Sequence, residues 1–473
     1  MLPKSSSFSC YWRINDRLIV SLRPFIVGVS ESLARGEELA RAVAVAAKSH
    51  PGPAAEFEFD PSDAKGTFGL KRRHLFREDD VIDQMIFGVR DQNALLRLQI
   101  PPEGLGEIAD LLYRSGSACF SAAELHRELA DDLHPVLDRL IDCGFLAGHD
   151  PAELSYRWDV DAPGITRLQH ASLLYRTKKA SVLVDPHFHS DYAAPVALNA
   201  TVGLSDLRDE VDAIVISHGH GDHFYLPTLM LFSRDIPIIV PKVPRATILC
   251  DDFAVVLASL GFRNVIPLEW HAPPYAIGDI EVHALPFYGE QPLLYEGPRD
   301  RDLRNWGNTY VVRCDGFCSW TLIDSGDDAA GCMASVAEEV RSRFGPIDFL
   351  LSNLRPFGIR SPFYITGSGH YWLSLTTDQM QRFHLMRNHC VTLGPPGVAK
   401  VCSIVGARYF LPYAHWWGEL GEPPQDDEVG LVGQLIEELK HVGADTRILS
   451  WKIGDQLRVR RNGQFDFVGP TVE

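Results

Sequence analysis

The sequence predicts an α/β fold in which two packed β-sheets carry helices on both outer faces, preceded by a smaller α+β module. From about Thr166 onward, short apolar runs rich in β-branched and aromatic residues alternate with helical patterns. The runs are SLLYR, SVLVD, DAIVI, PIIV, EVHAL, TYVVR, SWTLID, IDFLL and RYFLP. Strands followed by helices, in two successive sets, are typical of two sheets that bury one face against each other and the other under helices.

The length of the chain predicts more than one domain. At 473 residues it exceeds the size at which a single hydrophobic core usually stops growing. Residues 1–160 have a different pattern from the rest and are predicted to form the N-terminal module, and residues 161–473 the catalytic domain. Two features of the C-terminal half predict hairpins: Asp315-Gly316 between two β runs, and Asn462-Gly463 near the end.

The N-terminal module is predicted to mix strands and helices. Apolar stretches near Tyr11–Val20 and Pro24–Val29 favour strands, and the alanine-rich stretch Glu38–Ala47 favours a helix. Three short helices are predicted at its end, the second opening with the capping box Ser121-Ala-Ala-Glu124. This end resembles a winged-helix module, but it is acidic and lacks a basic recognition helix, so we expect protein docking, dimerisation or plain packing rather than DNA binding.

Composition excludes several classes of protein. The net charge of −17 argues against nonspecific nucleic-acid binding, and no segment has the roughly 20 uncharged apolar residues of a membrane span. Charged residues such as Arg13 and Asp16 interrupt the stretch where a signal peptide would be apolar. The nine cysteines have no C-x-x-C spacing and fit reduced thiols. We therefore expect a cytoplasmic protein without a membrane anchor.

The strongest chemical signal is the run His218-Gly-His220-Gly-Asp222-His223, which follows the apolar stretch VDAIVI. Strand ends are places where ligands converge, and glycines between the four side chains allow a tight turn. His218 and His220 can point at one metal, while Asp222 and His223 turn toward a second one nearby. Four ligand-type side chains within six residues after a buried strand therefore predict a two-metal site.

This run resembles the signature of the metallo-β-lactamase superfamily, and the resemblance covers roughly residues 166–473. It implies an αββα sandwich with the metal site at one edge, between the sheets. It also implies that Asp324, which ends the strand SWTLID, bridges the two metals, and that His415, just after RYFLP, is the last histidine ligand. Asp327 and Asp328 compete with Asp324 but are expected to cap the following helix.

Upstream, SVLVDPHF resembles the early strand of the superfamily that ends in aspartate. Asp185 would then orient one of the ligand histidines through a hydrogen bond. A turn cap before Pro186 is an equally good interpretation of the same residue.

One ligand departs from the usual superfamily pattern. Most members supply a histidine between the H-x-H-x-D-H run and the bridging aspartate, but this chain reads EVHALPFYGEQP, so Glu290 occupies the position. His271 and His283 are alternative ligands, and Glu290 could instead be a solvated loop carboxylate. With Glu290, the set becomes four histidines and three carboxylates, which favours iron over zinc because carboxylates stabilise the higher charge of ferric iron.

The same PF-aromatic-GE segment resembles a specific branch, the diiron β-hydroxylases of nonribosomal peptide pathways of the chloramphenicol type. The resemblance implies that His218, His220 and Glu290 bind one iron, that Asp222, His223 and His415 bind the other, and that Asp324 bridges them. Glu290 and Asp222 are the residues expected to matter most for catalysis. The arginine-rich stretch GPRDRDLRN and the loop SPFYITGSGHYW depart from that branch and leave the substrate open.

The expected function is that of a nonheme diiron monooxygenase in antibiotic biosynthesis. Two Fe ions and O2 would hydroxylate a C–H bond, and the resemblance implies the β-carbon of an aminoacyl group on a carrier protein, with electrons from an external donor. A free amino acid is an alternative substrate, and a homodimer is left open. The competing hypothesis is a dinuclear zinc hydrolase, in which the metals activate a bridging water.

Overall fold

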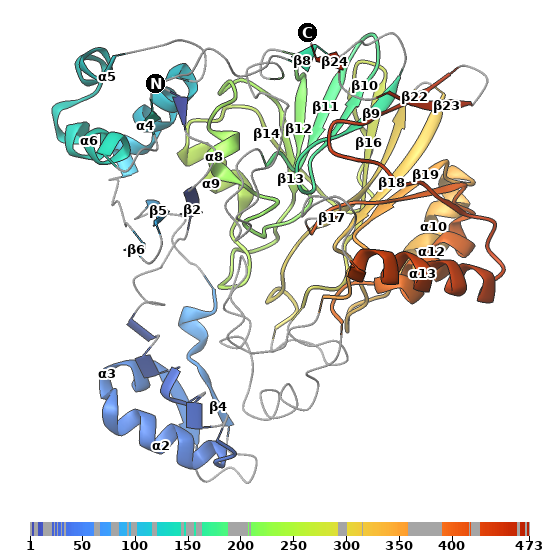
Figure 1. Cartoon of the computed structure of the whole chain (residues 1–473). Helices are drawn as coiled ribbons and strands as arrows, with labels where there is room; N and C mark the ends of the chain where they lie inside the picture. Colours follow the sequence, from blue (N-terminus) through green and yellow to red (C-terminus); the bar gives the residue numbers. More distant parts are fainter. Residues whose placement is uncertain are drawn as a thin grey trace.

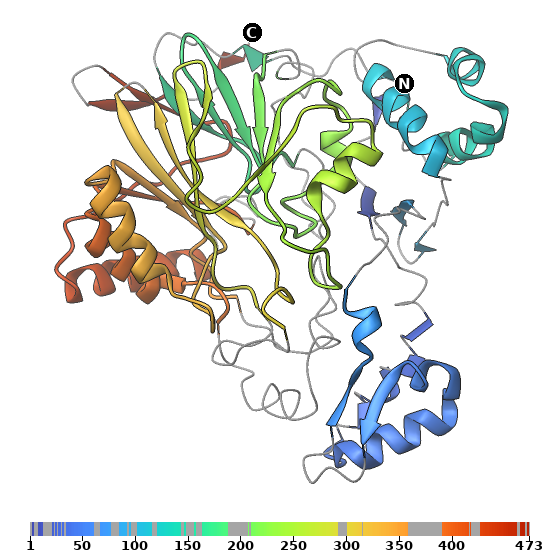
Figure 2. The same ribbon diagram turned by 180° about the vertical axis from the view of Figure 1, so that it is seen from behind.

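A computed structural model of the chain gives the architecture (Figures 1 and 2). It describes residues 2–3, 8–12, 21–22, 24–25, 27–29, 31–32, 35–60, 67–76, 85–91, 94–95, 102–115, 121–142, 146–147, 156–157, 163–187, 207, 210–291, 300–314, 316–357, 390–415, 417, 426–460, 464–468 and 471–472.

The first sheet has eight strands in the order β14-β13-β12-β11-β10-β9-β22-β23. Its strands are β9 (Gly164–Arg167), β10 (Leu173–Arg176), β11 (Ser181–Val184), β12 (Ala213–Val215), β13 (Ile238–Pro241), β14 (Val265–Leu268), β22 (Gln456–Val459) and β23 (Phe465–Val468). β11, β12, β13 and β14 run parallel, so their carboxyl ends meet at one edge of the sheet.

The second sheet has seven strands in the order β15-β16-β17-β18-β19-β20-β21. They are β15 (Tyr275–Ile277), β16 (Ile280–Pro286), β17 (Asn308–Cys314), β18 (Phe317–Ile323), β19 (Phe349–Ser352), β20 (Tyr409–Pro412) and β21 (Arg447–Ile448). β18 to β21 are parallel, and β15 to β18 form an antiparallel meander. All nine β runs predicted from the sequence are strands, and both predicted hairpins are present.

The two sheets pack face to face, and helices cover their outer faces (Figures 1 and 2). A buried cluster that includes Val215, Val282 and Leu411 fills the space between the sheets. The outer helices are α8 (Leu226–Leu229) and α9 (Phe253–Ser259) on the first sheet, and α10 (Met333–Phe344), α12 (Gly394–Val405) and α13 (Asp426–His441) on the second. The predicted αββα sandwich is confirmed.

The N-terminal part contains short strands and helices. They are β1 (Leu2–Pro3), β2 (Phe8–Trp12), α2 (Leu39–Ser49), α3 (Pro51–Ala54), β3 (Phe57–Asp60), β4 (Thr67–Leu70), the 3₁₀ turns η1 (Arg72–His74) and η2 (Asp131–Leu133), β5 (Met85–Asp91), β6 (Ala94–Leu95), α4 (Pro102–Ser115), α5 (Ala122–Glu128), α6 (His134–Asp142), β7 (Leu146–Ala147) and β8 (Tyr156–Arg157), which pairs with β24 (Thr471–Val472). The predicted helix near residues 38–47 and the three helices at the end of the module are confirmed. The capping box at Ser121 and Glu124 is formed by both of its hydrogen bonds.

One prediction for this part is wrong. The described residues of Pro24–Val29 are helical rather than extended. An apolar run of this length fits a buried helix as well as a strand, and periodicity alone does not separate the two. For Tyr11–Val20, the strand β2 accounts for the first two residues, and the remainder lies outside the described part of the chain.

Besides the pairing of β8 with β24, the N-terminal part contacts the catalytic half through residues 72–76. Phe76 forms a β-bridge with Thr247, and Arg72 lies 2.9 Å from the Asp300 carboxylate. Buried residues of both parts, Leu75 and Leu303 among them, belong to one apolar cluster. Among the described helices, none combines the length and apolar character that crossing a bilayer requires.

Candidate metal centre

The seven predicted site residues come from loops that follow strands of both sheets. The H-x-H-x-D-H run follows β12, Glu290 follows β16, Asp324 directly follows β18, and His415 follows β20. Because these loops lie at the same edge of the sandwich, side chains far apart in the sequence meet there. The side chains of His218, His223, Glu290 and Asp324 are almost completely buried.

Three of these residues surround a first position. Glu290 Oε2 lies 2.6 Å from His220 Nδ1 and 3.3 Å from His218 Nε2. One ligand atom from each residue lies within 4.8 Å of the others, as the donors of a single metal ion must. The structure therefore brings Glu290 to the position that the sequence pattern predicts.

Asp324 lies at the middle of the cluster. Its Oδ2 is 2.8 Å from His223 Nε2 and 3.9 Å from His218 Nε2, while its Oδ1 is 3.0 Å from His415 Nε2. Two oxygens that face histidines from different strands are what a carboxylate shared between two metals requires.

Asp222 has a neighbour that the sequence analysis missed. Its Oδ2 lies 3.1 Å from Nε2 of His170, a completely buried residue between β9 and β10, and both group with His223. His415 groups with Asp324 and Glu290 rather than with Asp222. No motif marks His170, because its proximity to Asp222 depends on how the loop between β9 and β10 packs against the loop that follows β12.

The donor atoms fit a metal because they are buried and lack other partners. Apart from the short contacts that the cluster side chains make with one another, no hydrogen-bond partner is found among the described residues for His218 Nε2, His223 Nε2, His415 Nε2, Glu290 Oε2 or either Asp324 carboxylate oxygen. Buried polar atoms without hydrogen bonds are costly, and several of them converging on one space are expected where a cation completes the structure.

The charges of the cluster compensate one another. Burial disfavours the charged form of His223, but the carboxylates of Asp324 and Asp222 outweigh this effect and raise its pKa well above the ordinary value. Burial likewise opposes ionisation of Asp324, yet His415 and His223 lower the pKa of that carboxyl well below its usual range. Bound metal ions would replace the protons on these histidines as the positive partners of the carboxylates.

Asp185 orients His223, which confirms one of the two interpretations of that residue. Its Oδ2 lies 2.9 Å from His223 Nδ1, and its Oδ1 accepts a hydrogen bond from the Ser217 backbone N–H at 2.7 Å. With Nδ1 held as a donor, Nε2 of His223 is directed at Asp324.

The loop that presents Glu290 is held by Asp328, and this corrects a prediction. Asp327 does accept a hydrogen bond from the Met333 N–H at the start of α10, at 2.8 Å, but Asp328 pairs with the buried Arg304 at 2.9 Å. Asp328 Oδ2 also accepts the Gly289 N–H at 3.0 Å. A buried cation competes better for a carboxylate than a helix end does.

Several backbones around the centre adopt left-handed conformations. Positive φ angles occur at His170, Asp185, Glu290, Ile323, Ala414 and His415. For residues other than glycine these conformations are uncommon, and for the β-branched Ile323 they are costly. Strain of this kind is typical of functional sites, where the surrounding structure holds side chains in directions that regular backbone does not allow.

Gly289→Ala should lower both stability and metal content. A Cβ there would lie 2.4 Å from the Gly326 nitrogen and from the Val391 oxygen, at a φ of +85°. The unfavourable φ alone costs about 1–3 kcal/mol, and the backbone clash would displace Glu290. Gly316→Ala is the matched control because it has a φ of +96° with no atom within 4 Å. Thermal unfolding and metal analysis of the two variants check this. If both lose stability equally and keep their metal, the close contact at Gly289 does not position Glu290.

The other histidines considered as ligands lie elsewhere. His271 is half exposed and contacts Glu339 at 3.0 Å, and His283 packs against Phe344 with its Nε2 near Glu281. His370, His384 and His389 lie outside the described residues, as does most of the loop 355–372.

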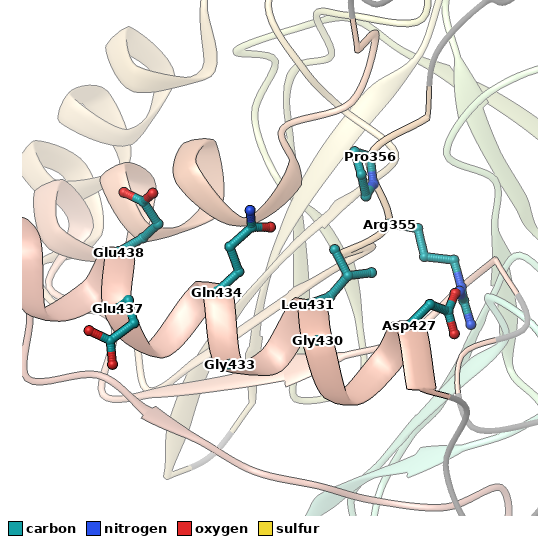
Figure 3. Close-up of a pocket in the computed structure, with 9 residues that line it drawn as sticks. All are labelled: Arg355, Pro356, Asp427, Gly430, Leu431, Gly433, Gln434, Glu437 and Glu438. Atoms are coloured by element: carbon teal, nitrogen blue, oxygen red, sulfur yellow. The ribbon is translucent and has the colours of Figure 1, made fainter.

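An open groove of about 690 Å³ lies along α13, and no residue of the metal cluster lines it (Figure 3). Arg355 connects the groove with the centre, because its Nε donates to the His415 carbonyl at 3.1 Å while its guanidinium also pairs with Glu428 at 2.7 Å. The N-terminus of α13 thus helps to hold the loop that carries His415.

Part of the chain is similar in sequence to known proteins. A 3-hydroxylase of Streptomyces venezuelae that acts on 4-amino-L-phenylalanyl-[CmlP-peptidyl-carrier-protein] is 27% identical over 217 residues, which cover 46% of this chain and 38% of that protein. A UPF0173 protein of Pyrococcus abyssi is 29% identical over 146 residues, covering 30% of this chain and 58% of that protein. The chain thus spans well under two thirds of the length of either relative.

Solved structures show the same fold. The crystal structure of CmlA, a diiron β-hydroxylase from Streptomyces venezuelae, superimposes with a TM-score of 0.55 at 16% identity, covering 94% of this chain and 90% of that one. A mutant of the CmlA β-hydroxylase gives the same TM-score of 0.55 at 17% identity, covering 92% of this chain and 82% of that one. The model of the beta-lactamase superfamily domain matches residues 180–416, half of the sequence and the part that contains all seven site residues. The chain therefore belongs to the metallo-β-lactamase-like proteins that carry this domain.

Proposed function

We propose that this protein is a nonheme diiron oxygenase that hydroxylates a C–H bond, with a metal centre formed by His218, His220, Asp222, His223, Glu290, Asp324 and His415. The observation that carries the proposal is the buried Glu290 carboxylate, 2.6 Å from His220 and 3.3 Å from His218, at a position where most superfamily members have a histidine. A third carboxylate makes the site anionic enough to favour ferric iron. Likeness to the Streptomyces 3-hydroxylase supports the same reaction class.

In such a site the metals and the side chains would have different roles. When bound, a pair of ferrous ions supplies the reduction of O2 and the cleavage of a C–H bond, chemistry that side chains alone do not perform. Asp324, which faces His223 and His415, would help to hold both metals, and Asp185 directs His223. His170 fixes the direction of the Asp222 carboxylate.

Substrate should approach from the side of Asp222 and His415. The Asp222 side chain is 23% exposed and that of His415 18%, whereas His218, Glu290 and Asp324 are at most 2% exposed. The deeply buried side would keep water away from the metals and so limit side reactions there.

The proposed substrate is an aminoacyl group on a carrier protein, hydroxylated at its β-carbon, because the Streptomyces relative acts on such a substrate. An external electron donor would supply the electrons.

We further propose that residues 1–160 form a module for docking or dimerisation. A dinuclear zinc hydrolase is the second candidate, since four histidines also suit zinc.

Protein produced with sufficient iron should carry about two irons per chain and consume O2 only with substrate and reductant present. Elemental analysis and mass spectrometry of an aminoacyl carrier protein, which should gain one oxygen atom, check this. Protein reconstituted with zinc is the control and should not hydroxylate. Stoichiometric zinc in the isolated protein, with full hydrolytic activity and no iron, would contradict the oxygenase proposal.

A further inference from the structure

We infer that Asn305 is a positioning residue for His220, accepting the ring Nε2–H through its side-chain oxygen when a metal occupies Nδ1. The inference rests on the proposed metal centre but not on which reaction that centre performs. It concerns the stretch GPRDRDLRN, which the sequence analysis singled out as a departure from the related branch and which the proposed mechanism leaves unused.

The two nitrogens of His220 face different partners. Nδ1 lies 2.6 Å from Glu290 Oε2 and therefore points into the cluster, while Nε2 lies 3.2 Å from the side-chain amide of Asn305. A metal bound at Nδ1 takes the lone pair of that nitrogen and leaves Nε2 as an N–H group, which can only donate. His220 thus needs a hydrogen-bond acceptor on its outer side, and Asn305 is the residue in place.

The amide of Asn305 can supply this acceptor. Its Nδ2 faces His220, and its Oδ1 is buried without a hydrogen-bond partner among the described residues. Rotation of the amide by 180° would direct Oδ1 at the ring N–H without breaking any bond of that oxygen. The two orientations occupy the same volume, and the one that presents Oδ1 to the ring matches an Nε2–H donor.

The backbone of Asn305 is held firmly enough for a positioning role. Its N–H donates to Gln291 Oε1 at 2.9 Å, and its carbonyl accepts from Gln291 Nε2 at 2.8 Å. The same Gln291 Nε2 lies 3.0 Å from the Gly289 carbonyl. The Gln291 side chain therefore links Asn305 to the loop that presents Glu290.

Arg304 anchors the same segment. It is buried, donates to the Phe287 carbonyl at 3.2 Å and to Asp328 at 2.9 Å, and its guanidinium lies 5.2–5.8 Å from the ring centres of Trp270, Tyr288 and Trp306. These contacts fix the Asn305 backbone relative to Pro286–Glu290. Ligands held by such outer contacts keep the direction that a metal requires.

Asn305→Leu tests the inference, because leucine has a similar shape but accepts no hydrogen bond. The affinity of full-length protein for Zn²⁺, measured by competition with a chelator, should fall about 10- to 100-fold for one of the two ions, the one that His220 would bind. In ¹⁵N NMR spectra of the zinc-loaded protein, the protected Nε2–H signal of His220 should be lost. Asn305→Asp, with a stronger acceptor, should keep both the affinity and the signal.

Asn308→Leu is the matched control. Asn308 is buried three residues further on, and its amide donates to the Leu268 carbonyl and the Tyr310 hydroxyl rather than to a ligand of the centre. It should lower the melting temperature and leave zinc affinity unchanged.

The outcomes distinguish a failure of the role inferred for Asn305 from a failure of the proposed metal centre. Wild-type protein that fails to bind two zinc ions would refute the proposed centre. Wild-type protein that binds two, together with an unchanged affinity and NMR signal in Asn305→Leu, would overturn the role of Asn305. If the leucine variant does not fold, the aspartate variant decides: weaker zinc binding than wild type would overturn the inference.

Discussion

Glu290→His should abolish O2-dependent hydroxylation while two metal ions remain bound. The substitution keeps a donor next to His218 and His220 but removes one negative charge from a buried position of the site. A neutral, nitrogen-rich site stabilises ferric iron less and suits zinc better. Loss of a residue that only hydrogen-bonds to a metal ligand typically lowers metal affinity or activity about 10- to 100-fold. Exchanging a ligand itself should therefore lower the hydroxylation rate at least about 100-fold.

The measurement pairs metal analysis with product mass spectrometry on the iron-loaded protein. Glu281→His is the matched control, because Glu281 lies on the same strand, β16, but is partly exposed and contacts Arg313 instead of the centre. It should retain both metal and rate. Wild-type hydroxylation by Glu290→His would show that Glu290 does not tune the iron, and full metal content and activity in Glu290→Ala would remove it from the ligand set and reopen the case for His271 or His283.

Asp324→Ala should reduce the metal content from two ions to at most one and eliminate turnover. Among the described residues of the cluster, only Asp324 lies within 3.0 Å of two histidines. One of its oxygens faces His223, and the other faces His415. On the proposed assignment, its loss would remove a bond from both metals and leave buried histidines without a counter-charge. His223→Ala should lower metal content as well, although it removes a donor from one metal only.

Asp327→Ala is the control for this pair. It should lose only the hydrogen bond to Met333 at the start of α10, at a cost of about 1 kcal/mol, and keep both metals. Metal analysis together with thermal unfolding distinguishes the cases. An Asp324→Ala protein that retained two metals and wild-type rate would disprove the bridging assignment.

The fold was largely predictable because its signals are local. Each of the nine predicted β runs of the catalytic half is a strand, because β-branched and aromatic residues favour strands. Pro24–Val29 failed because the same kind of apolar run also fits a buried helix. The division at residue 160 stays a prediction.

The centre was predictable only where ligand residues follow strands. The H-x-H-x-D-H run, Asp324 and Glu290 could be found because each occupies a recognisable position after an apolar stretch. His170 and Asn305 could not, because a buried contact between residues 52 or 85 positions apart depends on how the loops pack. Asp328 was misassigned for the same reason, since its partner Arg304 comes from another loop.

The contact between the N-terminal part and the catalytic half limits how the enzyme can be dissected. The segment that bears Arg72 and Leu75 packs beside Asp300 and Leu303, directly before Arg304 and Asn305. Cutting the chain near residue 160 would expose Leu303 to water and weaken the packing of the segment that places Arg304 and Asn305 next to His220. Loss of activity in such a fragment would therefore report a damaged centre as readily as a missing partner. A chimera that tests carrier recognition should retain residues 67–76 with the catalytic half and exchange only the surface of α4, α5 and α6.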